Sequence, residues 1–166
     1  VDDLFFPAKV NLAVLLSGQG RGAEAATLLR EVVAAYPDNG DARYSLGLLL
    51  VALGQANEAV AQMRRAVELM PRHARARYNL GLLLNQLGRA DEGGRLLAAA
   101  LALEPANPDF LLALADHDLE TGRPREALAL AERLIAAQPD QPAGRQLKAL
   151  AEQALAGSPP AAAHPR

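Results

Sequence analysis

The chain has 166 residues, enough for a core of ordinary domain size, and its many alanines and leucines suit closely packed helices. Its 17 basic and 19 acidic residues give a formal charge of -2, which argues against nucleic acid as a partner, because phosphate binding needs a clustered basic excess. Without cysteine there is no disulfide and no thiolate metal site. No apolar run reaches the roughly 18 residues of a membrane-spanning helix, so we expect no membrane insertion.

The first residues of the chain are unusually apolar. Leu4, Phe5 and Phe6 stand where a preceding helix would normally cover them, and two interpretations stay open. Either they fold back on the first helix pair, or they form an edge through which the protein associates into a homo-oligomer. Because the chain starts at Val1 rather than Met, we expect a piece of a longer protein, and bacterial cytoplasm or periplasm is left undecided.

A unit of 34 residues then repeats along the chain. The stretch from Gly40 to His73 is followed by Ala74 to Asn107 with nearly the same pattern of residue types. Three unrelated residue types keep this period across four copies, which indicates internal repeats. They are the prolines Pro37, Pro71, Pro105 and Pro139, the glycines Gly20, Gly54, Gly88 and Gly122, and the glutamates Glu24, Glu58, Glu92 and Glu126.

Each unit predicts two helices. In the second unit an apolar stripe at helical spacing runs from Ala42 to Leu53, and Gly54 ends this helix by taking the left-handed conformation. A second stripe ends before Pro71, which cannot continue a helix. Small residues recur where two helices must approach closely, whereas Gly94 has no such role in the pattern. The small residues are Ala13, Gly47, Gly81 and Ala115 in the first helices and Ala25, Ala59, Gly93 and Ala127 in the second.

After the last repeat, Pro142 opens one more amphipathic helix. Its apolar residues, among them Leu147, Leu150 and Ala151, are shifted by one residue from the repeat register. This favours a helix that covers the last repeat on one side and faces water on the other. Residues 157–166 are rich in alanine and proline without periodicity, so we expect a flexible tail.

Taken together, these features resemble tetratricopeptide repeats. The resemblance rests on the period, on the Leu46-Gly47 and Glu58-Ala59 pairs and their counterparts, on the glycine between the helices, and on the closing proline. It implies an all-α fold, a right-handed α-solenoid of stacked antiparallel helix pairs. The expected divisions are an N-terminal edge at 1–5, repeats at 6–39, 40–73, 74–107 and 108–141, a capping helix at 142–156, and the tail at 157–166.

One position departs from the pattern of the family. The large aromatic residue usual at the fourth position of such repeats is replaced by Lys9, Arg43, Arg77 and Leu111. Long aliphatic stems cover apolar surface while their charge stays in water, so we expect the packing to survive. His73, which ends a repeat, is expected to be solvated.

One cluster, Asp116-His117-Asp118, resembles a catalytic or metal site. Consecutive helical residues point about 100 degrees apart and do not converge on one atom, so we expect no enzyme, no metal and no cofactor. Asp118 stands where other repeats have leucine, and an unpaired buried charge is too costly. We therefore expect Arg125 or Arg145 to pair with it.

The resemblance implies that the first helices line a concave groove, which binds an extended peptide or a partner's helix. The asparagines of this groove offer a donor and an acceptor to a ligand's backbone. The tyrosines either offer broad contact to the ligand or pack between neighbouring first helices. Carried over from the repeat positions, the candidate residues are Asn11, Val14, Tyr44, Leu48, Arg75, Tyr78, Asn79, Leu82, Asn85, Asp109 and Asp116.

We expect an interaction scaffold whose partner is a protein or peptide. The basic residues with which chaperone-binding relatives hold a C-terminal carboxylate are missing at the corresponding positions. The expected ligand is instead apolar or aromatic in the middle, with a basic residue near Asp109, Asp116 and Glu120. The alternative is a structural or assembly module of a larger multidomain bacterial protein, self-associating through its N-terminal edge.

Overall fold

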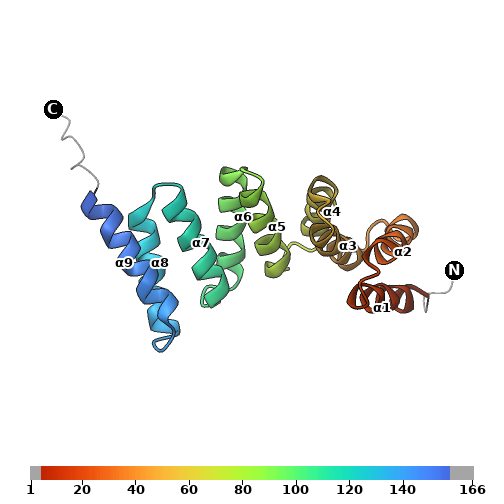
Figure 1. Ribbon diagram of the computed structural model, residues 1–166, viewed down its shortest axis with the longest axis horizontal. Helices are drawn as coiled ribbons and strands as arrows, with labels where there is room; N and C mark the ends of the chain where they lie inside the picture. The colour runs from red at the N-terminus through yellow and green to blue at the C-terminus, as the bar shows by residue number, and fades with distance from the viewer. Residues whose placement is uncertain (1–4, 158–166) are drawn as a thin grey trace.

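The computed structural model describes the backbone of residues 5–157 and the side chains of residues 7–157. This part of the chain forms nine α-helices and no strand, and none of these helices has both the length and the apolar character needed to cross a membrane. The helices follow one another along the long axis of the molecule, from α1 (Phe5–Gly18) at one end to α9 (Pro142–Gly157) at the other (Figure 1). The predicted α-solenoid is confirmed.

The helices form antiparallel pairs that also pack against the next pair. After α1 come α2 (Gly22–Ala35), α3 (Gly40–Ala52), α4 (Ala56–Leu69), α5 (Ala74–Gln86), α6 (Ala90–Leu103), α7 (Pro108–Glu120) and α8 (Pro124–Ala137), and α9 packs on α8 and α7. Gly157, assigned to the tail from the sequence, ends α9. Leu4 and the side chains of Phe5 and Phe6 lie outside the described residues, as do residues 158–166.

The first helix of each pair ends in the same way. Gly20, Gly54, Gly88 and Gly122 all have positive φ, between 72° and 78°, as the sequence predicts. The amide after each glycine donates to the carbonyl five residues earlier, at 2.9 Å for Gln55 and Leu50. These bonds satisfy carbonyl groups that have no partner within the helix, and they turn the chain into the second helix.

Polar side chains cap the next first helices at the same period. The Oδ1 atom of Asn39 accepts from the amide of Ala42 at 2.8 Å, and Asn107 caps α7 in the same manner. His73 takes this role for α5, because its Nδ1 accepts from the amide of Ala76 at 3.0 Å. The expectation that His73 is merely solvated is therefore wrong.

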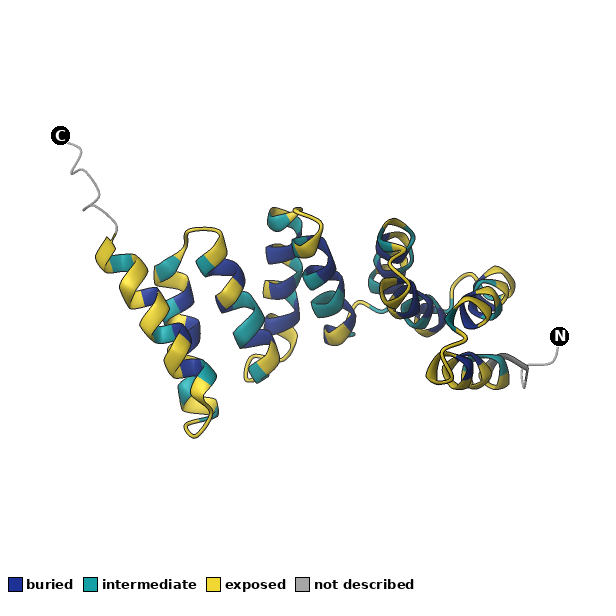
Figure 2. Ribbon diagram, in the orientation of Figure 1, coloured by how far each residue is buried: buried dark blue, intermediate teal, exposed yellow. Residues whose placement is uncertain are grey.

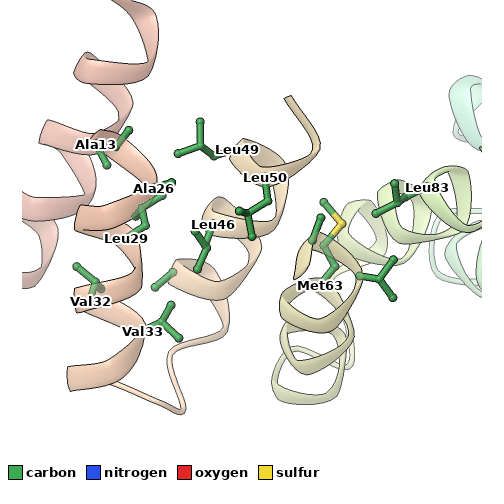
Figure 3. Packing of buried hydrophobic residues seen from close by; sticks show 14 of the residues in the cluster. Ala13, Ala26, Leu29, Val32, Val33, Leu46, Leu49, Leu50, Met63 and Leu83 are labelled. Atoms are coloured by element: carbon green, nitrogen blue, oxygen red, sulfur yellow. The ribbon is translucent and has the colours of Figure 1, made fainter. Parts of the chain in front are cut away.

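Leucine, valine and alanine fill the space between neighbouring helices (Figure 3). Buried residues face adjacent helices, while exposed residues cover the outer side of α9, where Leu150 is exposed although Leu147 and Ala151 are buried (Figure 2). The core forms two clusters that meet at α5, one reaching back to Ala13 and the other forward to Leu147.

Small residues stand where the two helices of a pair cross, as predicted. A Cβ atom added to Gly47 would lie 2.5 Å from Cγ of Met63. One added to Gly81 would lie 3.1 Å from the carbonyl oxygen of Gly93, so there the two backbones themselves are close. Larger side chains at these crossings would push the helices apart.

The basic residues at the fourth position do more than cover apolar surface. The guanidinium of Arg43 donates to the carbonyl of Pro37 at 2.7 Å and to Oε1 of Gln62 at 2.9 Å. In the next repeat Leu96 stands in the place of Gln62, and Nη1 of Arg77 is buried without a hydrogen-bond partner. The aromatic residue of the family pattern is thus replaced by hydrogen bonding in one repeat only.

Replacing Gly88 by alanine should lower the free energy of unfolding by about 1–2 kcal/mol, because an L side chain is disfavoured at positive φ. Gly18 is the matched control: it is helical, nothing lies within 4 Å of an added Cβ, and alanine there should stabilise by up to about 1 kcal/mol. Urea unfolding followed by circular dichroism measures both. Equal effects of the two substitutions would contradict this account of the turns.

Candidate functional site

The predicted site residues lie on α1, α3, α5 and α7, and we call the side of the row formed by these helices the first-helix face. Two hollows open on it. The N-terminal pocket, about 290 Å³, lies between α1 and α3 and includes Val14, Ser45 and Leu48 in its lining. The C-terminal pocket, about 270 Å³, lies between α5 and α7 and is lined in part by Leu82 and Asp116.

Apolar side chains dominate the N-terminal pocket. Val14 is 65% exposed and Leu48 is 40% exposed, so both offer apolar surface to a ligand. Asn11 lies one helical turn before Val14 on α1 and is also exposed. Burying these side chains under a partner is favourable in proportion to the apolar area removed from water.

Between the two pockets, side chains of α3 and α5 bind one another. Nδ2 of Asn79 donates to the hydroxyl oxygen of Tyr44 at 2.6 Å, and the Tyr44 ring lies 5.1 Å from the ring of His73. Burial raises the pKa of the Tyr44 hydroxyl above its ordinary value, against the effect of this hydrogen bond. For Tyr44, the structure shows the packing between first helices that the sequence left open.

The next residues form a second cluster, from α5 to α7. Both terminal nitrogens of Arg75 lie 3.1 Å from Oδ2 of Asp109. The guanidinium carbon of Arg75 also lies 5.1 Å from the centre of the Tyr78 ring and 5.3 Å from that of Phe110, and these two rings are 4.9 Å apart. Asp109 is thus already neutralised by a residue of the chain itself.

Two carboxylates of the C-terminal pocket have no such partner. Asp116 and Glu120 are one helical turn apart on α7, and neither forms an ion pair with another described residue. Burial and the charge of Glu120 both raise the pKa of the Asp116 carboxyl. A cationic group placed here would relieve the repulsion between the two carboxylates.

Two polar side chains of this region pack on a pair of adjacent glycines in α6. A Cβ added to Gly93 would overlap Oδ1 of Asn85, and one added to Gly94 would overlap Nε2 of His117. His117 is only 2% exposed, and neither its Nδ1 nor Oδ1 of Asn85 has a hydrogen-bond partner. Gly94 therefore has the steric role that sequence reasoning missed. The signal was present, because His117 stands where the other repeats have leucine.

The buried carboxylate of Asp118 pairs with a residue that the sequence did not suggest. Its Oδ1 lies 2.9 Å from Nη2 of Arg123, so the expectation of Arg125 or Arg145 is wrong. The turn at the end of α7 explains this, since the amide of Arg123 also donates to the carbonyl of Asp118 at 2.7 Å. Arg145 instead donates to the carbonyl of Pro139 at 2.6 Å.

The cluster Asp116-His117-Asp118 does not converge, since Asp116 belongs to the first-helix face and Asp118 pairs with Arg123 at the end of α7. Among residues 7–157, no three His, Asp or Glu side chains are grouped so as to hold a metal ion. The arrangement offers surfaces for binding, with apolar area at one end and unpaired carboxylates at the other.

The stability of the protein should fall as the pH drops below about 6.5, because burial lowers the pKa of His117 from that value. Arg123 lowers it further, against smaller opposing effects of Asp118, Glu120 and Asp91. A lowered pKa in the folded state means that the unfolded chain takes up the proton first, so stability present above pH 6.5 is lost as the pH falls through the folded pKa.

His117→Leu, which restores the residue of Leu49 and Leu83, should reduce this loss in urea unfolding at about pH 7.5 and 5.5. His73→Asn is the matched control, because it keeps the cap of α5 and leaves His117 in place. An unchanged pH dependence in His117→Leu would show that other groups cause the loss. The raised pKa of Asp118 acts in the opposite direction at lower pH.

Comparison with known proteins agrees with this architecture. A family model described as tetratricopeptide repeat matches residues 16–77 and 84–151, which is more than half of the chain. No curated protein sequence matches it.

Several solved structures have a similar fold. The crystal structure of MamA protein aligns with a TM-score of 0.85 and 21% identity over 91% of this chain and 82% of its own. A MamA MSR-1 structure is 26% identical over 84% of this chain and 81% of its own, with a TM-score of 0.71. A tetratricopeptide repeat protein from Parabacteroides merdae aligns with a TM-score of 0.85 and 14% identity, over 91% of this chain and 60% of its own. On the match of the family model, this chain belongs to the tetratricopeptide repeat family.

Proposed function

We propose that the protein is an interaction scaffold that binds a segment of a partner protein along the first-helix face. The observation that carries this proposal is the pair of pockets on one face, an apolar one between α1 and α3 and one with unpaired carboxylates between α5 and α7. Open faces of helical repeats suit such segments, because several first helices contribute contacts side by side.

The chemistry of the two pockets defines the ligand. Its apolar or aromatic side chains would lie against Val14 and Leu48, where exposed apolar area is largest. A lysine or arginine would lie in the C-terminal pocket, beside Asp116 and Glu120. Asp109 is a weaker candidate than the sequence suggested, because Arg75 already pairs with it.

A second candidate function, an assembly module, is favoured by the outer side of α1. Leu12 is 47% exposed and Leu15 is 58% exposed, whereas the equivalent Leu46 and Leu49 are 0% and 8% exposed. The same positions that bury themselves between repeats in the interior of the row are thus open on α1. A second copy of the chain would cover them in this reading.

Selection from a random peptide library should enrich sequences with apolar or aromatic residues and one lysine or arginine. Against a selected peptide, Asp116→Asn with Glu120→Gln should weaken binding by about tenfold, or about 1.4 kcal/mol, through loss of the charge pairing. Glu68→Gln is the control, because Glu68 lies on α4 and pairs with Arg65. Fluorescence anisotropy measures the affinities.

Failure to enrich any peptide would count against binding on the first-helix face. Peptides that bind equally to the Asp116→Asn, Glu120→Gln variant would remove only the cationic part of the proposal. Leu48→Asp should weaken peptides whose apolar residues lie in the N-terminal pocket, since it places a charge against apolar groups.

The assembly module makes a different prediction. Replacing Leu12 and Leu15 by glutamate should convert any self-associated form to a monomer, because charge on both partners would oppose the contact. Sedimentation velocity over a range of concentrations measures this, with Leu150→Glu on α9 as the control at the other end of the row. The same mass for all three proteins would reject α1 as the associating surface.

A further inference from the structure

Ion pairs of one kind join successive second helices at two places in the row. Arg30 of α2 binds Glu58 of α4 through two bonds, Nε to Oε1 at 2.8 Å and Nη2 to Oε2 at 2.7 Å. Arg64 of α4 pairs with Glu92 of α6 over the same separation of 28 residues. At both joints the arginine comes from one repeat and the glutamate from the first turn of the next second helix.

At the third joint the glutamate is present and the arginine is missing. The same spacing places Ala98 of α6 opposite Glu126, which lies in the first turn of α8. Both residues are exposed, and Glu126 forms no ion pair with another residue of the described part of the chain. An acceptor for an arginine is therefore conserved in the repeat while its donor has been replaced by a methyl group.

A pocket of about 410 Å³ lies at this joint, between α6, α7 and α8. We call it the α6–α8 pocket, and its lining includes Asp91, Arg95, Ala98, His117, Asp118 and Glu126. Three carboxylates line it against two guanidinium groups, those of Arg95 and Arg123, and Arg123 is already paired with Asp118 at 2.9 Å. The balance of charge favours one more cation.

The wall of the pocket supplies a second, independent sign of a polar ligand. The ring of His117 packs on Gly94, and both residues line the pocket. His117 is 2% exposed, yet its Nδ1 has no hydrogen-bond partner. Buried polar atoms are rarely left without a partner, so an unpaired ring nitrogen beside an unpaired carboxylate marks a place where something polar is missing.

We propose that the α6–α8 pocket binds the guanidinium group of an arginine side chain from a partner protein, in the position that Arg30 and Arg64 occupy at the first two joints. A guanidinium is planar and matches a carboxylate through two parallel bonds, as at Glu58. Ala98 and Leu114 leave apolar room for the aliphatic stem. The pocket is built from second helices and the end of α7, so this inference does not rest on binding along the first-helix face.

The first test uses a small probe of the same chemistry. N-butylguanidinium is titrated against the full chain while the ring signals of His117 are followed by carbon–proton correlation NMR. N-butylurea, neutral and of similar shape, is the control. A saturable shift of His117 with butylguanidinium alone is expected. No saturable shift, or the same shift with butylurea, would overturn the proposal.

Variants then locate the bound group. Glu126→Gln should abolish the shift, because it removes the acceptor without changing the shape of the side chain. Ala98→Arg should abolish it as well, because the chain then supplies its own arginine to Glu126, whereas Ala98→Gln should preserve most of it. Binding that persists in Glu126→Gln or in Ala98→Arg would place the cation elsewhere and reject the site.

A last comparison separates a partner protein from a small guanidinium compound. The capped tripeptide acetyl-Ala-Arg-Ala-amide should bind at least as tightly as butylguanidinium, because an arginine of a partner carries backbone on both sides. A tripeptide that causes no saturable shift, while butylguanidinium does, would overturn the assignment to a protein partner. Acetyl-Ala-Gln-Ala-amide controls for contacts of the peptide backbone.

Discussion

The close crossing of the two helices in each pair is the constraint on which the rest of the structure depends. Only a glycine or an alanine fits at these crossings, and at Gly81 and Gly93 the two backbones nearly touch. A pair this thin has no interior of its own, so its leucines must be buried against the neighbouring pairs. The row of helices, and the surfaces on its two sides, follow from that requirement.

Each side of the row uses the repeat differently. On the first-helix face, Tyr44 with Asn79 and Arg75 with Asp109 link one repeat to the next, so part of the predicted binding surface is also structural. On the second helices the links are arginine–glutamate pairs. Exposed pairs of this type contribute little to stability, so their regular spacing matters more for the orientation of successive repeats than for the free energy of folding.

The sequence predicted what the period controls and missed what depends on contact between repeats. The left-handed glycines and the small residues at the crossings follow from local chemistry that recurs every 34 residues. Gly94 was unexplained because its contact, His117, lies on another helix. Arg123 was missed as the partner of Asp118 because their pairing depends on the geometry of the turn after α7. Whether the predicted site residues bind a ligand is a question that neither periodicity nor packing answers.

The two hydrophobic clusters that meet at α5 have a consequence for how the molecule comes apart. The N-terminal cluster is knitted together by leucines, whereas the C-terminal half includes the joint where a histidine and an aspartate replace them. In a row where each unit touches only its neighbours, heat or mechanical pulling acts on such joints separately. Melting would then proceed from one block to the other, and a single transition temperature would describe neither of them.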